Sequence, residues 1–403
     1  MSSRFATLRR IPRGVWIIGF VSLLMDISSE MIHSLLPLFM ATALGTPVVV
    51  IGLIEGFAEA TALCVKVFSG VISDYIGKRK GLAVLGYGLG AASKPLFALA
   101  STSGMVFSAR IIDRLGKGIR GAPRDALVAD VTPPDIRGAA YGLRQTLDTT
   151  GSFLGPLLAV GLMLLWHNDF RSVYWVAVIP AFLAVGLLCF GLHEPRKPVE
   201  HRRSNPIKKE NLKRLGRDCW QVIGLGAVFT LARFSEAFLV LRAQEVGIPL
   251  ALIPLVMVAM YVVFSVTAYP FGRLSDTLSH RRLLQMGLLV LIAADITLAM
   301  SQGWQGIIAG VALWGVHMGM TQGLFNAMVA RTAPADLRGT AFGIFSLLSG
   351  AGLLLASLGA GLLWDIWGSG STFYAGALLC LLTLLVTRFA PEKACKKAAL
   401  RRP

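Results

Sequence analysis

The sequence predicts an all-α integral membrane protein in which twelve transmembrane helices form two pseudo-symmetric six-helix bundles. Hydrophobic residues make up 55% of the chain and charged residues only 15%, and the apolar runs are long. Soluble domains contain about 25% charged residues, whereas a membrane span needs about 20 mostly apolar residues in succession. This composition excludes a soluble enzyme and a polar nucleic-acid-binding domain.

The twelve predicted spans are apolar runs separated by polar or basic loops. They cover residues 15–40, 48–72, 80–101, 103–129, 139–166, 171–192, 219–242, 248–273, 282–301, 303–330, 340–366 and 370–390. The polar, basic segment 193–218 is predicted to link an N-terminal bundle (1–192) to a C-terminal bundle (219–390), and residues 391–403 form a tail.

The distribution of basic residues predicts the orientation. The net charge is +17, and most Lys and Arg residues occur in alternate loops, in the linker 193–218 and in the two termini. Cytoplasmic loops of membrane proteins are enriched in Lys and Arg. We therefore expect both termini and the linker to be cytoplasmic, in a monomer surrounded by the lipid of the cell membrane, which would be the inner membrane in a Gram-negative cell.

The two halves contain matching motifs about 200 residues apart, which predicts two parallel repeats. Gly70-Val-Ile-Ser-Asp74 recurs as Gly272-Arg-Leu-Ser-Asp276, in each case followed by basic residues. Asp135-Ile-Arg-Gly recurs as Asp336-Leu-Arg-Gly in front of the fifth and eleventh spans. Such repeats are typical of secondary transporters built from two bundles.

These motifs resemble those of the major facilitator superfamily, over essentially the whole chain. The loop after the second span matches the family's G-x-x-x-D-[RK]-x-G-[RK]-[RK]-[RK] motif at Gly70, Asp74, Lys78 and Arg79, although Tyr75 replaces the usual basic residue. The resemblance implies two rocking bundles and a loop motif that holds one conformation. We expect Asp74, and Asp276 in the second copy, to act in this latch.

The fifth span contains Gly151-Ser-Phe-Leu-Gly155-Pro156, which is similar to the G-x-x-x-G-P motif of the family's proton-coupled exporters. The resemblance implies a gating role for Gly151, Gly155 and Pro156. In this family the second helix packs between the two halves, so Glu55 and Glu59 are also expected to act in gating.

The first span carries Asp26, Glu30 and His33 along one stripe, because residues four and seven apart share a helix face. Two carboxylates one turn apart in a medium of low dielectric constant cannot both be ionised at low cost. One of them therefore binds a proton more readily, as a proton-coupling group must. We predict that Asp26 and Glu30 couple transport to protons and that His33 lies in the substrate cavity. A structural ion pair and a divalent-metal site remain alternatives.

The fourth span is the richest in charge. Arg110, Arg114, Lys117 and Arg124 lie within about 40° of a common line on a helix. We expect this cationic stripe to face the acids of the first span. Three residues of this stripe, Arg110, Arg114 and Lys117, are predicted to line the substrate cavity together with Asp113. Arg124 and Asp125, nearer the cytoplasmic end, are expected to partner Asp74 in gating.

The C-terminal half has fewer ionisable residues within its spans. Arg233 and Glu236 are three residues apart in the seventh span, and His317 lies in the tenth. We expect all three residues in the substrate cavity.

Nothing in the sequence indicates an enzyme, a cofactor or a resident metal site, because P-loop and zinc-ligand motifs are absent. The leading prediction is a proton-coupled secondary transporter that exports a small organic molecule by alternating access. The alternatives are uptake of an anionic metabolite by proton symport, transport of a divalent metal and, in a different class, a membrane sensor that does not transport.

Overall fold

The computed structural model describes residues 10–76, 79–193, 214–274, 278–334 and 337–387. These residues are helices and short connections, and no strand occurs among them. They form two compact units. Unit 1 contains residues 10–46, 57–193 and 249–258, and unit 2 contains residues 47–56, 214–248 and 259–387. The predicted domain boundaries at residues 192 and 219 stay predictions, because most of 193–218 lies outside the described residues.

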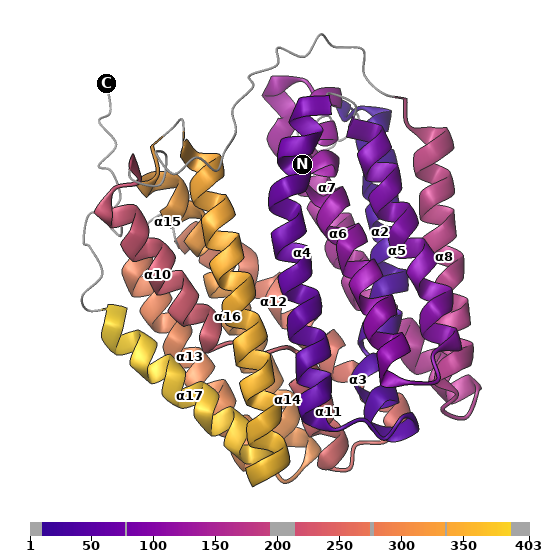
Figure 1. Ribbon diagram of the computed structural model, residues 1–403, viewed down its shortest axis with the longest axis vertical. Helices are drawn as coiled ribbons and strands as arrows, with labels where there is room; N and C mark the ends of the chain where they lie inside the picture. The colour runs from indigo at the N-terminus through magenta and orange to yellow at the C-terminus, as the bar shows by residue number, and fades with distance from the viewer. Residues whose placement is uncertain (1–9, 77–78, 194–213, 275–277, 335–336, 388–403) are drawn as a thin grey trace. The chain divides into compact units, whose positions relative to one another are not determined.

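The helices of unit 1 run alongside one another (Figure 1). In chain order they are α2 (Arg13–His33), α3 (Leu36–Leu38), the π-helical turn η1 (Phe39–Ala43), α4 (Val48–Ile76, of which residues 48–56 belong to unit 2), α5 (Arg79–Leu99), α6 (Ser103–Val131), the 3₁₀ turn η2 (Pro134–Ile136), α7 (Arg137–Leu165) and α8 (Phe170–Gly191). Helix α2 packs against α7 and α8, and α5 packs against α6 and α8.

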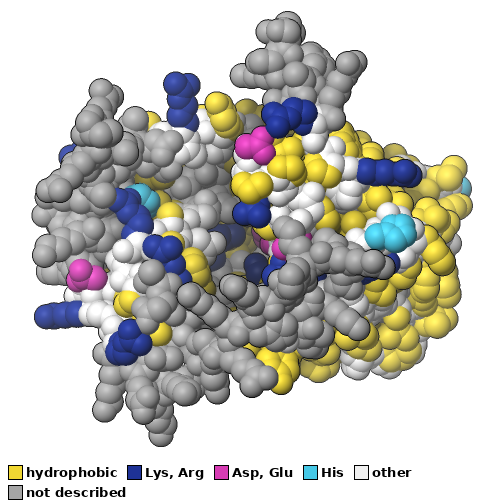
Figure 2. All heavy atoms as spheres, turned by 90° about the horizontal axis from the view of Figure 1, so that it is seen from above, with side chains coloured by type: hydrophobic (Ala, Val, Ile, Leu, Met, Phe, Trp, Pro, Cys, Tyr) yellow, Lys and Arg dark blue, Asp and Glu magenta, His cyan; other side chains and the backbone are white. Residues whose placement is uncertain are grey.

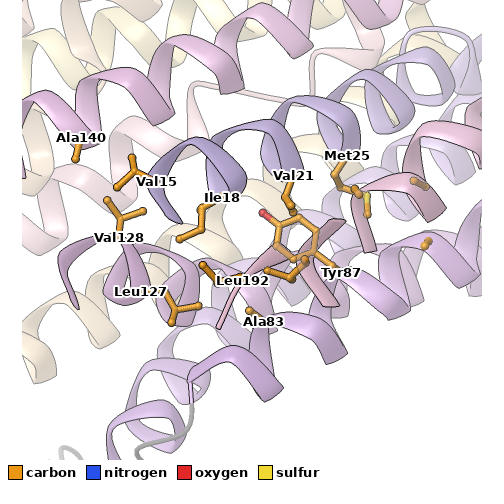
Figure 3. Packing of buried hydrophobic residues seen from close by; sticks show 14 of the residues in the cluster. Val15, Ile18, Val21, Met25, Ala83, Tyr87, Leu127, Val128, Ala140 and Leu192 are labelled. Carbon is orange, nitrogen blue, oxygen red and sulfur yellow. The ribbon is translucent and has the colours of Figure 1, made fainter. Parts of the chain in front are cut away.

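A hydrophobic cluster fills one end of unit 1 (Figure 3). Val15, Ile18, Val21 and Met25 of α2 meet side chains of α5 and α6 there, among them Tyr87. Each of these side chains is 2% exposed or less. Beside this cluster α5 and α6 approach each other through small residues, as is common in membrane bundles. A Cβ atom at Gly116 of α6 would lie 2.5 Å from the carbonyl oxygen of Gly86 in α5.

Unit 2 contains most of the remaining helices. These are α10 (Arg217–Leu231), α11 (Ala237–Glu245), α12 (Leu255–Leu274), α13 (His280–Met300), α14 (Trp304–Thr321), α15 (Leu324–Thr332), α16 (Arg338–Trp367) and α17 (Ser369–Val386); the 3₁₀ turn η3 (Leu250–Leu252) and the start of α12 belong to unit 1. Helix α13 packs against α14 and α17, and α16 packs against α10.

Ten helices of the described residues are long and apolar enough to cross a membrane, which confirms an all-α multi-pass protein. They correspond to ten of the twelve predicted spans. The other two predicted spans coincide with α6, which is long but highly charged, and with α10 and α11, which are interrupted at residues 232–236. The count of twelve is therefore compatible with the structure.

Basic side chains mark one end of unit 1. Figure 2 looks along the helices from the end where α2 begins, and Lys and Arg side chains are prominent there on the described part of unit 1. Arg13 and Arg137 are exposed residues that begin α2 and α7, respectively. This pattern is typical of a cytoplasmic face.

Candidate functional site

The interior of unit 1 contains two groups of charged side chains, both within helices of membrane-spanning length. We call the first the Asp113 cluster. Its members come from α2, α4, α5 and α6 and are Glu30, His33, Glu59, Lys94, Arg110, Asp113, Arg114 and Lys117, of which Lys117 is exposed and interacts with the others only electrostatically.

The centre of the Asp113 cluster is a fully buried ion pair. The Lys94 Nζ atom lies 2.8 Å from Oδ1 of Asp113, and the two side chains are 0% and 2% exposed. Lys94 also donates a hydrogen bond to Ser29 Oγ at 3.0 Å. The pair therefore joins α5 to α6 and contacts α2. Lys94 had no predicted partner, because the sequence does not reveal which acid faces the third span.

Two arginines of α6 extend the cluster towards α4. The Nε atom of Arg114 lies 3.2 Å from Asp113 Oδ2, and its Nη1 atom lies 2.9 Å from Glu59 Oε1. Arg110 lies 4.0 Å from Asp113 and 3.9 Å from Glu59. Glu59, which was predicted to act in gating, thus belongs to the same network as the predicted cavity residues.

His33 lies between the acids and the arginines. Its imidazole contacts the guanidinium groups of both Arg110 and Arg114, the latter at 2.6 Å. Its ring nitrogens also lie 3.7 Å from Glu30 and 3.5 Å from Asp113. The stripe predicted on the first span therefore meets the cationic stripe of the fourth at His33 and Glu30.

The second group, the Asp26 cluster, lies on α2, α6 and α7. It comprises Asp26 on α2, Arg120, Arg124 and Asp125 on α6, and Arg144 and Asp148 on α7. Asp26 interacts electrostatically with Asp148, Arg120 and Arg124. Asp26 and Glu30, predicted as one proton-coupling pair, therefore have different partners.

Arg124 and Arg144 each contact two acids of the Asp26 cluster. Arg124 lies 3.2 Å from Asp125 and 3.5 Å from Asp148, and Arg144 lies 3.6 Å from Asp125 and 3.5 Å from Asp148. The pairing of Arg144 with Asp148 is evident from their i,i+4 spacing, but their contacts with α6 are not. The predicted pairing of Arg124 with Asp74 stays a prediction, because the Asp74 side chain lies outside the described residues.

The Gly-Pro motif of α7 holds that helix against the acids of α2. A Cβ atom at Gly151 would lie 2.7 Å from the Leu23 carbonyl oxygen, and one at Gly155 would lie 2.7 Å from that of Ile27. The same two positions face Asp26 and Glu30, at 3.0 and 2.8 Å from their Cβ atoms. The two glycines thus allow the backbone of α7 to contact the backbone of α2 beside both acids. Pro156, which follows Gly155, is buried.

The remaining predicted gating residues are dispersed. Gly70 faces α6, and Arg79 pairs with Asp130 of α6 at 2.5 Å. Glu55 is 4% exposed and lies in the part of α4 that belongs to unit 2, where the neighbouring Gly56 packs on α16. Lys78 and Asp276 lie outside the described residues.

In unit 2 the predicted cavity residues do not form a comparable network among the described contacts. Arg233 and Glu236 lie in the interruption between α10 and α11, so the helical spacing assumed for them is wrong. Tyr261 donates a hydrogen bond to Glu236 at 3.3 Å. His317 is fully buried, and its Nδ1 lies 2.8 Å from the Gly287 carbonyl oxygen, which is a packing arrangement.

Comparison with known proteins identifies the family. The model of the Major Facilitator Superfamily matches residues 18–242 and 223–402. An uncharacterised MFS-type transporter of Methanocaldococcus jannaschii is 33% identical over 389 residues, covering 94% of this chain and 96% of the relative. The multidrug resistance protein MdtH of Yersinia pestis is 26% identical over 363 residues, covering 87% of each chain.

Solved structures agree on the fold. The crystal structure of a bacterial homologue of the human lysosomal transporter Spinster, in an inward-facing and occupied conformation, matches with a TM-score of 0.77 at 15% identity, covering 96% of this chain and 98% of the other. The helical architecture, the repeated loop motif and these matches together place the chain in the major facilitator superfamily, as a multi-pass membrane transporter rather than an enzyme.

Proposed function

We propose that this transporter exports a small organic molecule in exchange for protons, by alternating access of its two bundles. The observation that carries the proposal is the set of buried ion pairs in unit 1, above all Lys94–Asp113. An ionisable side chain in a membrane span costs about 2.5–3.5 kcal/mol on insertion, and such residues concentrate where ions or substrates pass. Structural stability alone does not account for so many of them on four helices.

The chemistry of the two clusters supports proton coupling. Asp26 and Glu30 are carboxyl groups inside the membrane-spanning part of α2, and cations of α6 face both. A carboxyl group in such surroundings changes its interaction with the cations when it gains or loses a proton, and this change can bias two conformations differently. We assign Asp26 to proton coupling and place Glu30 in contact with the substrate-binding residues.

Residues of both units are proposed to contact the substrate. In unit 1 these are His33, Arg110, Asp113, Arg114 and Lys117, which belong to the Asp113 cluster. In unit 2 they are Arg233 and Glu236, whereas His317 is fully buried against the Gly287 carbonyl oxygen and is no longer proposed to contact the substrate. The proposed gating residues remain Glu55, Glu59, Asp74, Arg79, Arg124 and Asp125, with the α7 Gly-Pro motif. The proposed topology has both termini in the cytoplasm, and the proposed oligomeric state is a monomer.

Export is favoured by two observations. The relative MdtH is named for multidrug resistance. In addition, the motif from Gly151 to Pro156 packs directly beside Asp26 and Glu30, where a gate that prevents proton leakage would act.

Proton-symport uptake of an organic anion is the second candidate. Among the described side chains, the cations of the Asp113 cluster outnumber its acids, and Arg110 and Arg114 offer guanidinium groups of the kind that bind carboxylate and phosphate. Divalent-metal transport is disfavoured. The His33 ring contacts two guanidinium groups, and the described residues hold no cluster of three or more metal-binding side chains.

The direction of proton movement distinguishes export by proton antiport from uptake by proton symport. Full-length protein is first screened in detergent against small organic cations and anions by thermal shift, at mildly acidic and mildly alkaline pH, since a ligand stabilises the state that it binds. A stabilising compound is then loaded into right-side-out proteoliposomes with a pH-sensitive dye. Antiport predicts that efflux of the compound acidifies the lumen. Alkalinisation would establish symport, and efflux with no change in lumenal pH would refute proton coupling.

A further inference from the structure

Among the described side chains, two lysines inside the membrane-spanning helices of unit 1 have no acid in direct contact. Lys66 lies in the span of α4, and Lys117 is the central residue of α6. Both side chains are exposed, and neither forms an ion pair within 4.0 Å among the described residues. Lys94, by contrast, is fully buried against Asp113. A lysine in a span is costly unless it has a partner or faces a water-filled cavity, so this lysine pair indicates such a cavity.

Helices α4 and α6 pack closely where the lysine pair lies. The Ser69 hydroxyl of α4 donates a hydrogen bond to the Gly118 carbonyl oxygen of α6 at 2.9 Å. The side chain of Lys66 lies over Gly121 of α6, where a Cβ atom would be 3.7 Å from the Lys66 Cε atom. Gly121 is one helical turn from Lys117, so the two lysines are about 6 Å apart along the axis of α6.

Lys66 lies on the face of α4 that is turned to α6, not on its apolar face. Large apolar side chains that α4 exposes, such as Phe68 and Tyr75, are about 160–180° away from Lys66 around the helix. Glu59, by contrast, is within about 20° of Lys66. Its carboxylate lies 2.9 Å from an arginine of α6. The two ammonium groups therefore belong to one polar surface formed by α4 and α6.

The charged groups around the lysine pair leave both ammonium groups available to an anion. Four residues interact electrostatically with Lys117 over longer distances, namely Glu30, Glu59, Asp26 and Arg114. Two of these acids have nearer partners, because Glu59 lies 2.9 Å from Arg114 and Glu30 lies 3.7 Å from His33. An anion from outside the protein would therefore meet two ammonium groups that no described acid contacts.

We propose that Lys66 and Lys117 form the binding site for the acidic group of the transported molecule, which is an organic anion that carries a carboxylate, a sulfonate or a phosphate. A lysine ammonium is a compact charge on a flexible stem, so it can follow the oxygens of such groups without a fixed geometry. Arg110 and Arg114 already contact acids of the protein. The lysine pair is thus the place where an added anion meets no competing carboxylate within contact distance.

This inference rests on the proposed function and names the class of molecule that is transported. It applies to export and to uptake, because both directions use the same binding site. In the thermal-shift screen, organic anions should stabilise the protein, and organic cations of the same shape should not.

Covalent labelling of the full-length protein in detergent tests the proposal. The probe is para-formylbenzoate, an organic anion whose aldehyde condenses with a lysine amine to an imine and water. Cyanoborohydride then reduces the imine, and mass spectrometry of peptides identifies the labelled lysines. The matched control probe is para-formylbenzamide, which has the same shape and aldehyde but no charge.

The anionic probe should label Lys66 and Lys117 about tenfold faster than the neutral probe, because the second ammonium group attracts its carboxylate. The buried Lys94 should react with neither probe. Lys117→Gln should abolish the preference at Lys66. Because the Lys117 side chain is exposed, this replacement should preserve the fold. Lys80→Gln, at the cytoplasmic end of α5, is the matched control variant and should leave the preference intact.

Equal rates with the two probes, or no labelling of Lys66 and Lys117, would overturn the inference. Benzoate and phenyl phosphate should protect both lysines. Protection by phosphatidylglycerol but by neither soluble anion would assign the site to a lipid headgroup and would also overturn it. The labelling uses no gradient and no transport, so its failure is distinguishable from a failure of the proposed proton exchange.

Discussion

The Lys94–Asp113 ion pair shows how much of the protein's stability can depend on one buried side chain. Removing one partner of a buried ion pair commonly costs about 3–5 kcal/mol, because the other charge stays buried. Lys94→Met should therefore destabilise the protein by about 3 kcal/mol, since Arg114 still contacts Asp113 at 3.2 Å. Thermal unfolding in detergent measures the loss. Adding Asp113→Asn should restore part of it, and strictly additive losses would show that the two side chains do not interact.

Replacing Asp295 of α13 with an apolar residue should stabilise the protein. It is 0% exposed, and neither carboxyl oxygen has a hydrogen-bond partner among the described residues. A buried polar group without a partner costs about 1–3 kcal/mol, so Asp295→Leu, which has nearly the same shape, should raise the melting temperature. Asp113→Leu is the matched control and should lower it. A loss of stability in Asp295→Leu would reveal a partner for this acid.

For individual residues, the sequence predicts which face of a helix a side chain occupies better than it predicts which side chains it contacts. Helical spacing correctly put Glu30 and His33 on the face of α2 that meets α6. It also grouped Asp26 with Glu30, and both acids do lie beside glycines of α7, but Glu30 contacts His33 whereas Asp26 lies near Arg120 and Arg124. The position of Asp26 beside α7 depends on how closely α2 approaches α7, and Gly151 permits that close approach, which no property of the acids reveals.

Among the elements, the contact of α7 with α2 gives the clearest test. A Cβ atom at Gly155 would lie 2.7 Å from a backbone oxygen of α2, whereas one at Gly161, on the same helix, would meet nothing within 4 Å. Overpacking costs about 1–3 kcal/mol, so Gly155→Val should destabilise the protein by at least that amount and Gly161→Val should not. Thermal unfolding and the yield of monodisperse protein report the difference. Equal effects of the two substitutions would contradict the close packing.

The seventh predicted span is interrupted in the structure, and this break cannot be predicted from the local sequence. Residues 219–242 are apolar and contain no proline, so a continuous helix is the natural prediction. In the structure, residues 232–236 leave the helix. Hydrogen bonds from outside the helical ladder satisfy the backbone there: Ser235 N donates to Ser357 Oγ at 3.2 Å and Ala237 N donates to Ser235 Oγ at 3.3 Å. Ser357 belongs to α16, and its position cannot be inferred from local sequence.

On the scale of the whole molecule, the two repeats share a fold but differ in charge. Trp314 stands in the second repeat where Asp113 stands in the first, and Gly315 stands where Arg114 stands. The charged clusters described above are confined to unit 1, as far as the described residues show. We therefore assign proton chemistry to the first repeat, and we assign the conformational change to the motifs common to both repeats.

The central claim is that protons drive transport through Asp26. The most direct test compares wild type with Asp26→Asn in proteoliposomes, using the compound found by thermal shift. We expect a pH gradient to drive accumulation by the wild type. The variant should lose at least tenfold of this activity while it still exchanges labelled for unlabelled compound without a gradient. Gradient-driven accumulation by Asp26→Asn at the wild-type rate would contradict it.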